Sequence, residues 1–177
     1  MDDDTGRRRN ELAELREQLQ AEIRELIHTV NLAEAAVAAL EQTAEVLDCT
    51  AGWSAADILG GGAIISMIKN NELDAALDMA AQADDHLSAL RQRLTSMPPS
   101  IVARELHVDA VTRFADISLD NTLVDISAHH QIAAVQDQID SALWHVCDIR
   151  TKLRYQITAG RVKLRKAEAE WQRLSRP

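Results

Sequence analysis

The sequence predicts an all-α protein, and three observations carry this prediction. Residues that interrupt helices are few, with six Gly and three Pro among 177 residues. Aromatic residues make up only 3% of the chain, so strand formers are scarce. Apolar residues recur at steps of three and four over long stretches, which is typical of helices packed along a shared seam. We therefore expect a long antiparallel helical bundle, or coiled-coil stalk, that carries a glycine-rich head of short helices.

The first stalk helix is predicted over residues 8–48. Leu12 lies on its apolar seam, but Arg16 occupies the next core position, so we expect the first turns to fray or splay. Gly52-Trp53-Ser54 is expected to end the helix. The main seam consists of Leu19, Ile23, Leu26, Val30, Ala33, Val37, Leu40, Ala44 and Leu47.

Residues 50–126 are predicted to form the head, or a second hairpin packed on the stalk. We expect one or two helical turns up to Leu59, a short helix from Ala63 to Lys69, and a new helix capped by Asn71. Pro98-Pro99 should end that helix. Its seam consists of Leu73, Ala76, Ala80, Ala83, Leu87, Leu90, Leu94 and Met97.

The second stalk helix is predicted over residues 127–175. Its seam consists of Ile132, Val135, Ile139, Ala142, Val146, Ile149, Leu153, Ile157, Gly160, Leu164, Ala167, Trp171 and Leu174. Two long seams need partners of similar length, so we expect the stalk helices to run antiparallel within a single helical domain, 1–177. Leu19, Ile23 and Leu26 should then lie in the layers of Ile157 to Leu164. We also expect charges on the two helices to face one another, with Glu14, Glu17 and Glu22 opposite Arg161, Lys163 and Arg165.

Three consecutive glycines, Gly60, Gly61 and Gly62, lie inside the apolar segment Ile58–Ile68. They fit neither a Walker loop, which needs Lys and Ser or Thr directly after the last glycine, nor a dinucleotide loop, which follows a strand. A helical corner is favoured because glycine permits positive φ and close approach of backbones. A contact with a partner or lipid, and an anion site at a helix N-terminus, remain open.

Two motifs resemble a family of uncharacterised bacterial helical proteins. They are W-S-x-x-D-x-L-G-G-G-x-I-x-S-x-x-K from Trp53 to Lys69 and F-A-D-x-x-L-D-N-x-x-x-D from Phe114 to Asp125. The resemblance covers about 50 central residues and implies no established activity. This chain has Ile117-Ser118-Leu119 where that family tends to have aromatic residues, so an aromatic patch there would be missing.

The carboxylates of the head are the strongest candidates for a chemically active site. Asp116 and Asp120 are four residues apart and share a face if that stretch is helical, and Asp57 or His107 could join them around a divalent cation. Each Asp is explained as well by a helix cap or a solvated face. The histidines and the two cysteines show no metal-binding spacing. We therefore expect no metal and no cofactor, with Asp57, Asp116 and Asp120 as weak metal candidates.

Charge is unevenly distributed along the chain. The net charge is −9, yet residues 151–177 alone carry +6. The acidic remainder argues against a nucleic-acid surface. The chain starts Met1-Asp2-Asp3-Asp4, without a basic leader, and no apolar run approaches the ~20 residues of a membrane span. We expect a cytoplasmic protein, and the preference for Arg over Lys fits a GC-rich bacterial genome.

The leading functional hypothesis is a non-enzymatic scaffold or adaptor that binds a protein partner, or itself as a homo-oligomer. One alternative is a peripheral membrane protein that inserts Ile58–Ile68 into a membrane surface, and another is a bundle that binds a metal or small ligand. No catalytic residues are expected. The predicted structural and recognition residues of the head are Trp53, Asp57, Gly60, Gly61, Gly62, Lys69, Phe114, Asp116, Asp120 and Asp125.

Overall fold

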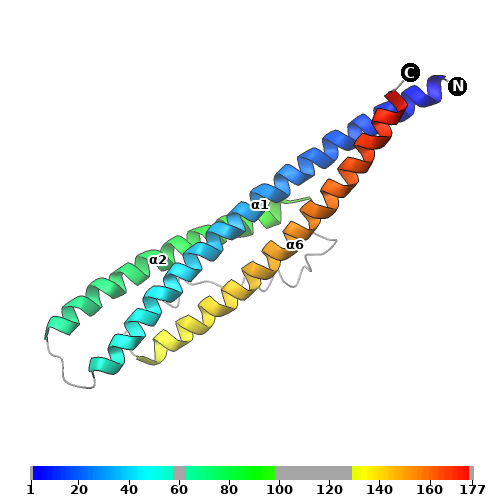
Figure 1. Cartoon of the computed structure of the whole chain (residues 1–177). Helices are drawn as coiled ribbons and strands as arrows, with labels where there is room; N and C mark the ends of the chain where they lie inside the picture. The colour runs from blue at the N-terminus through cyan, green and yellow to red at the C-terminus, as the bar shows by residue number, and fades with distance from the viewer. Residues whose placement is uncertain (1, 58–62, 99–128, 176–177) are drawn as a thin grey trace. The chain divides into compact units, whose positions relative to one another are not determined.

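The structure of the chain is a computed structural model that describes residues 2–57, 63–98 and 129–175. These residues form helices α1 (Asp2–Asp57), α2 (Ala63–Ser96) and α6 (His129–Ser175), and no strand occurs among them (Figure 1). Side chains are described over residues 4–48, 78–98 and 136–175. The predicted all-α class is confirmed.

The described helices belong to two compact units. Unit 1 comprises residues 1–31 and 151–177, and unit 2 comprises residues 32–150. Helices α1 and α6 each supply residues to both units. The predicted division into a stalk and a head at 50–126 is untested, and residues 58–62 and 99–126 of that head lie outside the described residues.

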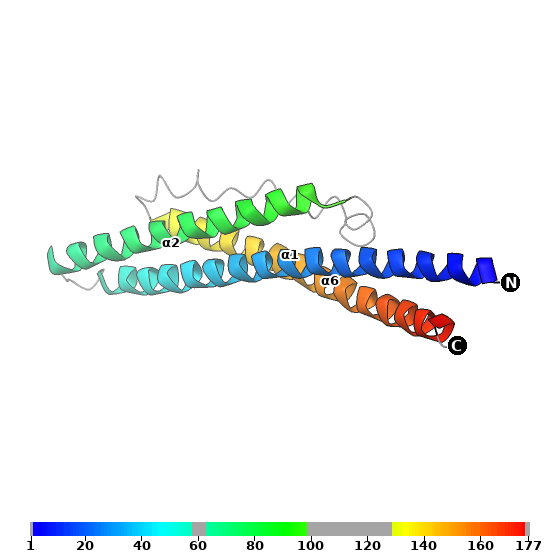
Figure 2. The ribbon, with the colours of Figure 1, turned by 90° about the horizontal axis from the view of Figure 1, so that it is seen from above.

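Unit 1 is built from the first part of α1 and the last part of α6. Contacts join Arg8 to Glu170, Arg16 to Glu168 and Ile23 to Gly160. Residue numbers rise on one helix as they fall on the other, so the two segments run antiparallel, and both chain ends lie at one end of this unit (Figures 1 and 2). Its buried apolar residues follow a narrow seam, as two paired helices require: Leu12, Leu19, Ile23, Leu26, Val30, Leu153, Ile157 and Ala167.

Unit 2 packs three helical segments, from α1, α2 and α6. The buried stripe of α1 is wider here than in unit 1, and it includes pairs of adjacent residues such as Ala36-Val37 and Ala39-Leu40. In both Figures 1 and 2, α2 lies beside the part of α1 that follows residue 31. Alanines at the contacts let helices approach closely. The core from α2, from Met97 directly after it, and from α6 consists of Ala80, Ala83, Leu87, Leu90, Leu94, Met97, Ile139, Ala142, Val146 and Ile149.

Helix α1 corrects two predictions about the first stalk helix. It begins at Asp2 and continues through Gly52-Trp53-Ser54 to Asp57, instead of spanning 8–48. One glycine in a helix interior costs only about 1 kcal/mol relative to Ala. Ala51, Ala55 and Ala56 are strong helix formers that flank the interruption.

Helix α2 corrects a third prediction. It runs from Ala63 to Ser96 without the expected new start at Asn71. Asn is only a weak helix breaker, costing less than about 0.7 kcal/mol in a helix interior. The helix ends before Pro98-Pro99, as predicted. Helix α6 starts at His129, close to the predicted residue 127, and ends at Ser175.

The predicted facing of acidic residues on the first helix and basic residues on the last remains a prediction. Glu14, Glu17, Arg161, Lys163 and Arg165 are exposed. The ion pairs Arg8–Glu170 and Arg16–Glu168, which join the helices of unit 1, have the opposite polarity, with the cation on α1 and the carboxylate on α6. The antiparallel layers of unit 1 therefore rest on the apolar seam.

Candidate functional site

Most of the predicted head residues lie outside the described residues. These are Gly60, Gly61, Gly62, Phe114, Asp116, Asp120 and Asp125. Trp53 and Asp57 lie in the last turns of α1 and Lys69 lies in α2, but their side chains are not among those described. The recognition surface, the Ile58–Ile68 contact and the weak metal site therefore remain predictions.

The part of the chain that the structure describes brings no three His, Cys, Asp or Glu side chains together in an arrangement that could hold a metal ion. Over the same residues, none of the helices combines the length and the hydropathy needed to cross a membrane. These findings apply only to the described segments and leave residues 58–62 and 99–126 of the head untested.

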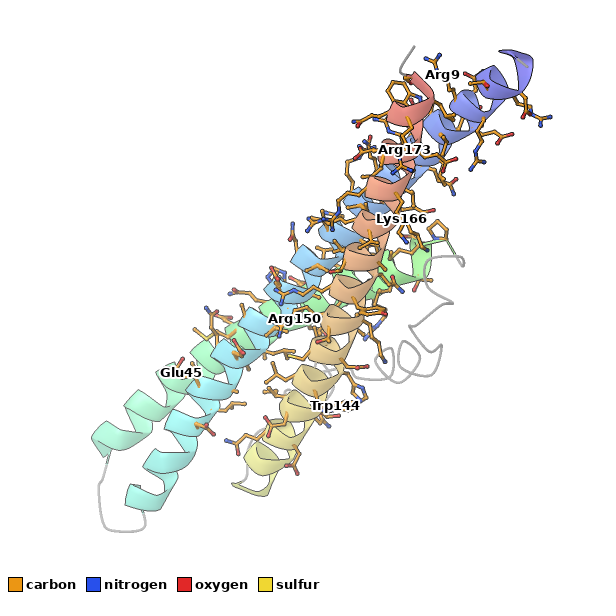
Figure 3. All side chains as sticks on the ribbon, turned by 45° about the vertical axis from the view of Figure 1, so that its right-hand side comes forward. Arg9, Glu45, Trp144, Arg150, Lys166 and Arg173 are labelled. Atoms are coloured by element: carbon orange, nitrogen blue, oxygen red, sulfur yellow. The ribbon has the colours of Figure 1, made fainter. Side chains whose placement is uncertain are left out.

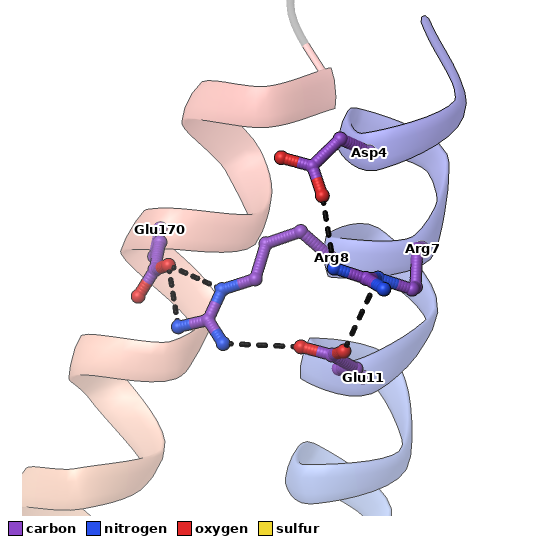
Figure 4. A network of polar contacts seen from close by, with 5 residues as sticks. All are labelled: Asp4, Arg7, Arg8, Glu11 and Glu170. Carbon is purple, nitrogen blue, oxygen red and sulfur yellow. Dashed lines mark hydrogen bonds and ion pairs between the residues drawn. The ribbon is translucent and has the colours of Figure 1, made fainter. Parts of the chain in front are cut away.

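Charged residues link the two helices at the terminal end of unit 1 (Figure 4). Arg8 donates from Nε and Nη2 to Oε1 of Glu170, at 3.0 and 2.9 Å, and from Nη1 to Glu11 at 3.2 Å. Arg7 bonds to Asp4 at 3.0 Å within the same helix. Hydrogen bonds to Glu170, and next to Glu11, raise the pKa of the Arg8 guanidinium above its ordinary value. This guanidinium is therefore a fixed positive charge that helps hold the helices in register.

Arg16 occupies a seam position without disrupting the helix. Its guanidinium lies over the Trp171 ring, 5.0 Å from the centroid, and its Nη2 is 3.9 Å from Glu168. Arg9 approaches the same ring at 6.0 Å. The indole face attracts both cations. This arrangement accommodates a charged residue in the seam and explains why the first turns of α1 remain helical.

Two polar residues are fully buried among the described side chains, Thr29 and Thr43. Each hydroxyl donates to the carbonyl four residues earlier, Glu25 for Thr29 at 2.9 Å and Ala39 for Thr43 at 2.8 Å. These hydroxyls are satisfied by their own helix. Both threonines therefore act as packing residues.

A shallow, open depression on α2 is lined by hydroxyl, amide and guanidinium side chains, among them Ser88, Arg91, Gln92, Thr95 and Ser96. Thr95 donates to the carbonyl of Arg91, and Ser96 donates to the carbonyl of Arg93. These two hydroxyls are engaged with the backbone and are not poised as nucleophiles.

Trp144 is the most exposed large apolar side chain that the structure describes, with 67% of its surface accessible. It lies on the outer surface of α6 in unit 2 (Figure 3), and its ring meets His145 edge-on at 4.9 Å. This exposure excludes a place in the core of the described chain for Trp144. Asp137 and Asp140 are also exposed and share the face of Trp144, since they precede it by seven and four residues. We call these three residues the acidic face.

The last part of α6, in unit 1, also exposes apolar residues. Tyr155 is 62% exposed and Val162 is 40% exposed. Their spacing of seven places them on one side of the helix, opposite the buried seam of Leu153, Ile157 and Ala167. Exposed Arg165, Lys166 and Ala169 follow on the same side. We call Tyr155, Val162, Arg165, Lys166 and Ala169 the basic face, and Figure 3 shows Lys166 on this stretch.

Sequence reasoning did not select either face, although the heptad pattern contained the signal. Trp144 falls between the seam positions Ala142 and Val146, so periodicity places it away from the core. An aromatic residue at such an exposed position indicates a candidate binding surface.

Comparisons with known proteins do not decide among these surfaces. No protein-family model, no curated protein and no solved structure matches the chain.

Proposed function

We propose that the protein is a non-enzymatic helical scaffold or adaptor that acts through protein–protein contacts. The observation that carries this proposal is the 67% exposure of Trp144. A tryptophan side chain is costly to leave in water, and binding surfaces are enriched in this residue because it buries a large area on contact. The exposed carboxylates of Asp137 and Asp140 beside it would favour one orientation of the bound partner and would select partners with basic surfaces.

The packing of the described helices supports the same proposal. Their buried side chains are almost entirely apolar, and the ion pairs Arg8–Glu170 and Arg16–Glu168 of unit 1 join helix to helix. Long helices with an exposed second face are suited to holding a partner helix along their length. Under this proposal no cofactor is needed, and the head at 50–126 would supply a further recognition surface.

The test is site-specific photocrosslinking in living cells. The photoreactive residue p-benzoylphenylalanine replaces Trp144 in one variant and the exposed Gln92 of α2 in a matched control. We expect a discrete protein adduct, whether a second copy or another protein, from position 144 and none from position 92. Failure of position 144 to capture any protein would refute the proposed function at this surface.

A further inference from the structure

The acidic face and the basic face of α6 are complementary in charge and similar in construction. Each consists of exposed residues at helical spacing and includes an exposed apolar side chain, Trp144 in the acidic face and Val162 in the basic face. Each also carries an exposed charge four residues from that apolar side chain, Asp140 before Trp144 and Lys166 after Val162. The charged residue precedes the apolar residue in the acidic face and follows it in the basic face, at the same spacing of four. The two faces therefore match when the two helices lie antiparallel.

Net charge supports pairing between different units. The residues of unit 1 include 13 basic and 10 acidic side chains, a net charge of +3. Those of unit 2 include 6 basic and 18 acidic side chains, a net charge of −12. Two copies of unit 2 repel one another, whereas unit 1 of one copy attracts unit 2 of the next.

We propose that the partner of the acidic face is the basic face of a second copy of this chain, with the two α6 helices antiparallel. In this register Trp144 of one copy covers Val162 of the other, and Asp140 meets Lys166. Asp137 then lies opposite Ala169, one turn from Lys166 and Arg165. The inference rests on the proposed function and names its partner.

A parallel arrangement is disfavoured by the same residues. With Trp144 again on Val162, Asp137 and Asp140 would lie opposite Tyr155 and Thr158, which carry no charge. The antiparallel order places Asp140 directly opposite an exposed cation, Lys166, which the parallel order does not. Opposed charges at the flanks of a helical seam select orientation in this way.

Charge reversal with rescue tests the pairing. Asp140→Lys and Lys166→Glu should each weaken self-association of the full chain about tenfold, as sedimentation equilibrium measures it. The double variant Asp140→Lys/Lys166→Glu should recover wild-type association, and so should an equimolar mixture of the single variants. Matched controls are Asp85→Lys on α2 and Lys163→Glu on another side of α6, both at exposed positions. They reverse the same charges and should leave association unchanged.

Trp144→Ala supplies an independent measurement. Because Trp144 is largely exposed within one chain, the variant should keep its helical circular dichroism and melting temperature. Its dissociation constant should rise about 30-fold or more, as expected for a central tryptophan.

The outcomes separate this inference from the proposed function. If Asp140→Lys and Lys166→Glu each leave self-association unchanged, the proposed pairing is overturned, but a protein-binding role is not. The same holds if each single variant weakens association and the double variant does not restore it. If the chain remains monomeric while position 144 captures a different protein in cells, the pairing of two copies is overturned and the protein-binding role remains. Wild-type chains that stay monomeric and bind phosphatidylglycerol vesicles through the basic face would replace the second copy with a lipid surface. If position 144 captures nothing and the chain is monomeric, both proposals fail.

Discussion

Gly160 of α6 packs directly against Ile23 of α1 within unit 1. A Cβ atom built on Gly160 would lie 3.2 Å from Cγ1 of Ile23 and 3.6 Å from its Cδ1. The shorter distance is below ordinary van der Waals contact, so the missing side chain lets the helices approach here. Gly160 also occupies a seam position, where it replaces a larger residue.

Gly160→Ala should fail to gain the stability that alanine normally brings to a helix. The substitution improves helix propensity by up to about 1 kcal/mol, but the new methyl group must displace Ile23. We expect the free energy of unfolding to stay level or fall, as measured by urea denaturation. Gly6→Ala is the matched control, because nothing lies within 4 Å of its added Cβ, and it should be neutral or stabilising. A clear gain at Gly160, equal to or above that at Gly6, would refute the close approach.

Arg16→Leu should preserve or increase stability, because leucine restores an apolar residue at a seam position. Arg16 is only partly exposed and is held by Trp171 and Glu168. Replacing a charged group by a packed apolar one is often neutral or favourable, and we expect a gain of up to about 1 kcal/mol from the buried area. Arg16→Ala, which loses the packing on Trp171 without replacing it, should cost about 1 kcal/mol.

The matched control for Arg16 is Arg9→Leu. Arg9 is exposed and more distant from the same ring, so its substitution should change the free energy of unfolding by less than about 0.5 kcal/mol. A large loss in Arg16→Leu, measured by urea denaturation, would mean that the positive charge itself is required in this seam.

Heptad spacing predicted which residues would be buried far better than it predicted where helices begin and end. Leu19, Ile23 and Leu26 are buried as expected, because a seam repeated over several heptads leaves little ambiguity. Helix ends depend on costs near 1 kcal/mol, which neighbouring residues can offset, so Gly52 did not end α1.

Tertiary context explains what the sequence pattern missed in unit 2. The seam predicted Ala44 as a core residue, whereas the neighbouring Thr43 is fully buried and Ala44 only partly. A heptad seam assumes one partner helix, but α1 in unit 2 packs within a group of three segments and buries a wider face. The exposure of Trp144 follows from the same periodicity, but whether a partner covers it is not encoded in spacing.

Arg8→Gln should lower stability by an amount that is independent of pH over roughly pH 6 to pH 10. The pKa of Arg8 is raised in the folded chain, first by Glu170 and then by Glu11. A raised pKa stabilises the fold at every pH below the unfolded value. That contribution disappears only as the pH passes the folded value, which is above the tested window. Urea denaturation at three pH values would measure the difference from wild type.

The salt dependence of the destabilisation by Arg8→Gln tests the same ion pair. Arg8 and Glu170 are both about half exposed, so added salt should reduce the effect of Arg8→Gln. Arg7→Gln is the matched control, because the ion pairs of Arg7 with Asp4 and Glu11 lie within α1. It should affect unfolding less than Arg8→Gln does. An effect of Arg8→Gln that changed steeply between pH 7 and pH 9 would contradict the assignment to the guanidinium.

Cysteines at Leu19 and Leu164 should form a disulfide within one chain. The contacts of Arg16 with Glu168 and of Ile23 with Gly160 place Leu19 and Leu164 in the intervening antiparallel layer of unit 1. The background carries Cys49→Ser and Cys147→Ser, and the control pair is Glu17→Cys with Leu164→Cys, since Glu17 is exposed on the other side of α1. Under mild oxidation at high dilution, the first pair should close rapidly to a monomer of altered mobility on non-reducing gels, and the control should not. If the first pair instead gave only crosslinks between chains, the long helices would pair with their own copies and the antiparallel arrangement of unit 1 would be wrong.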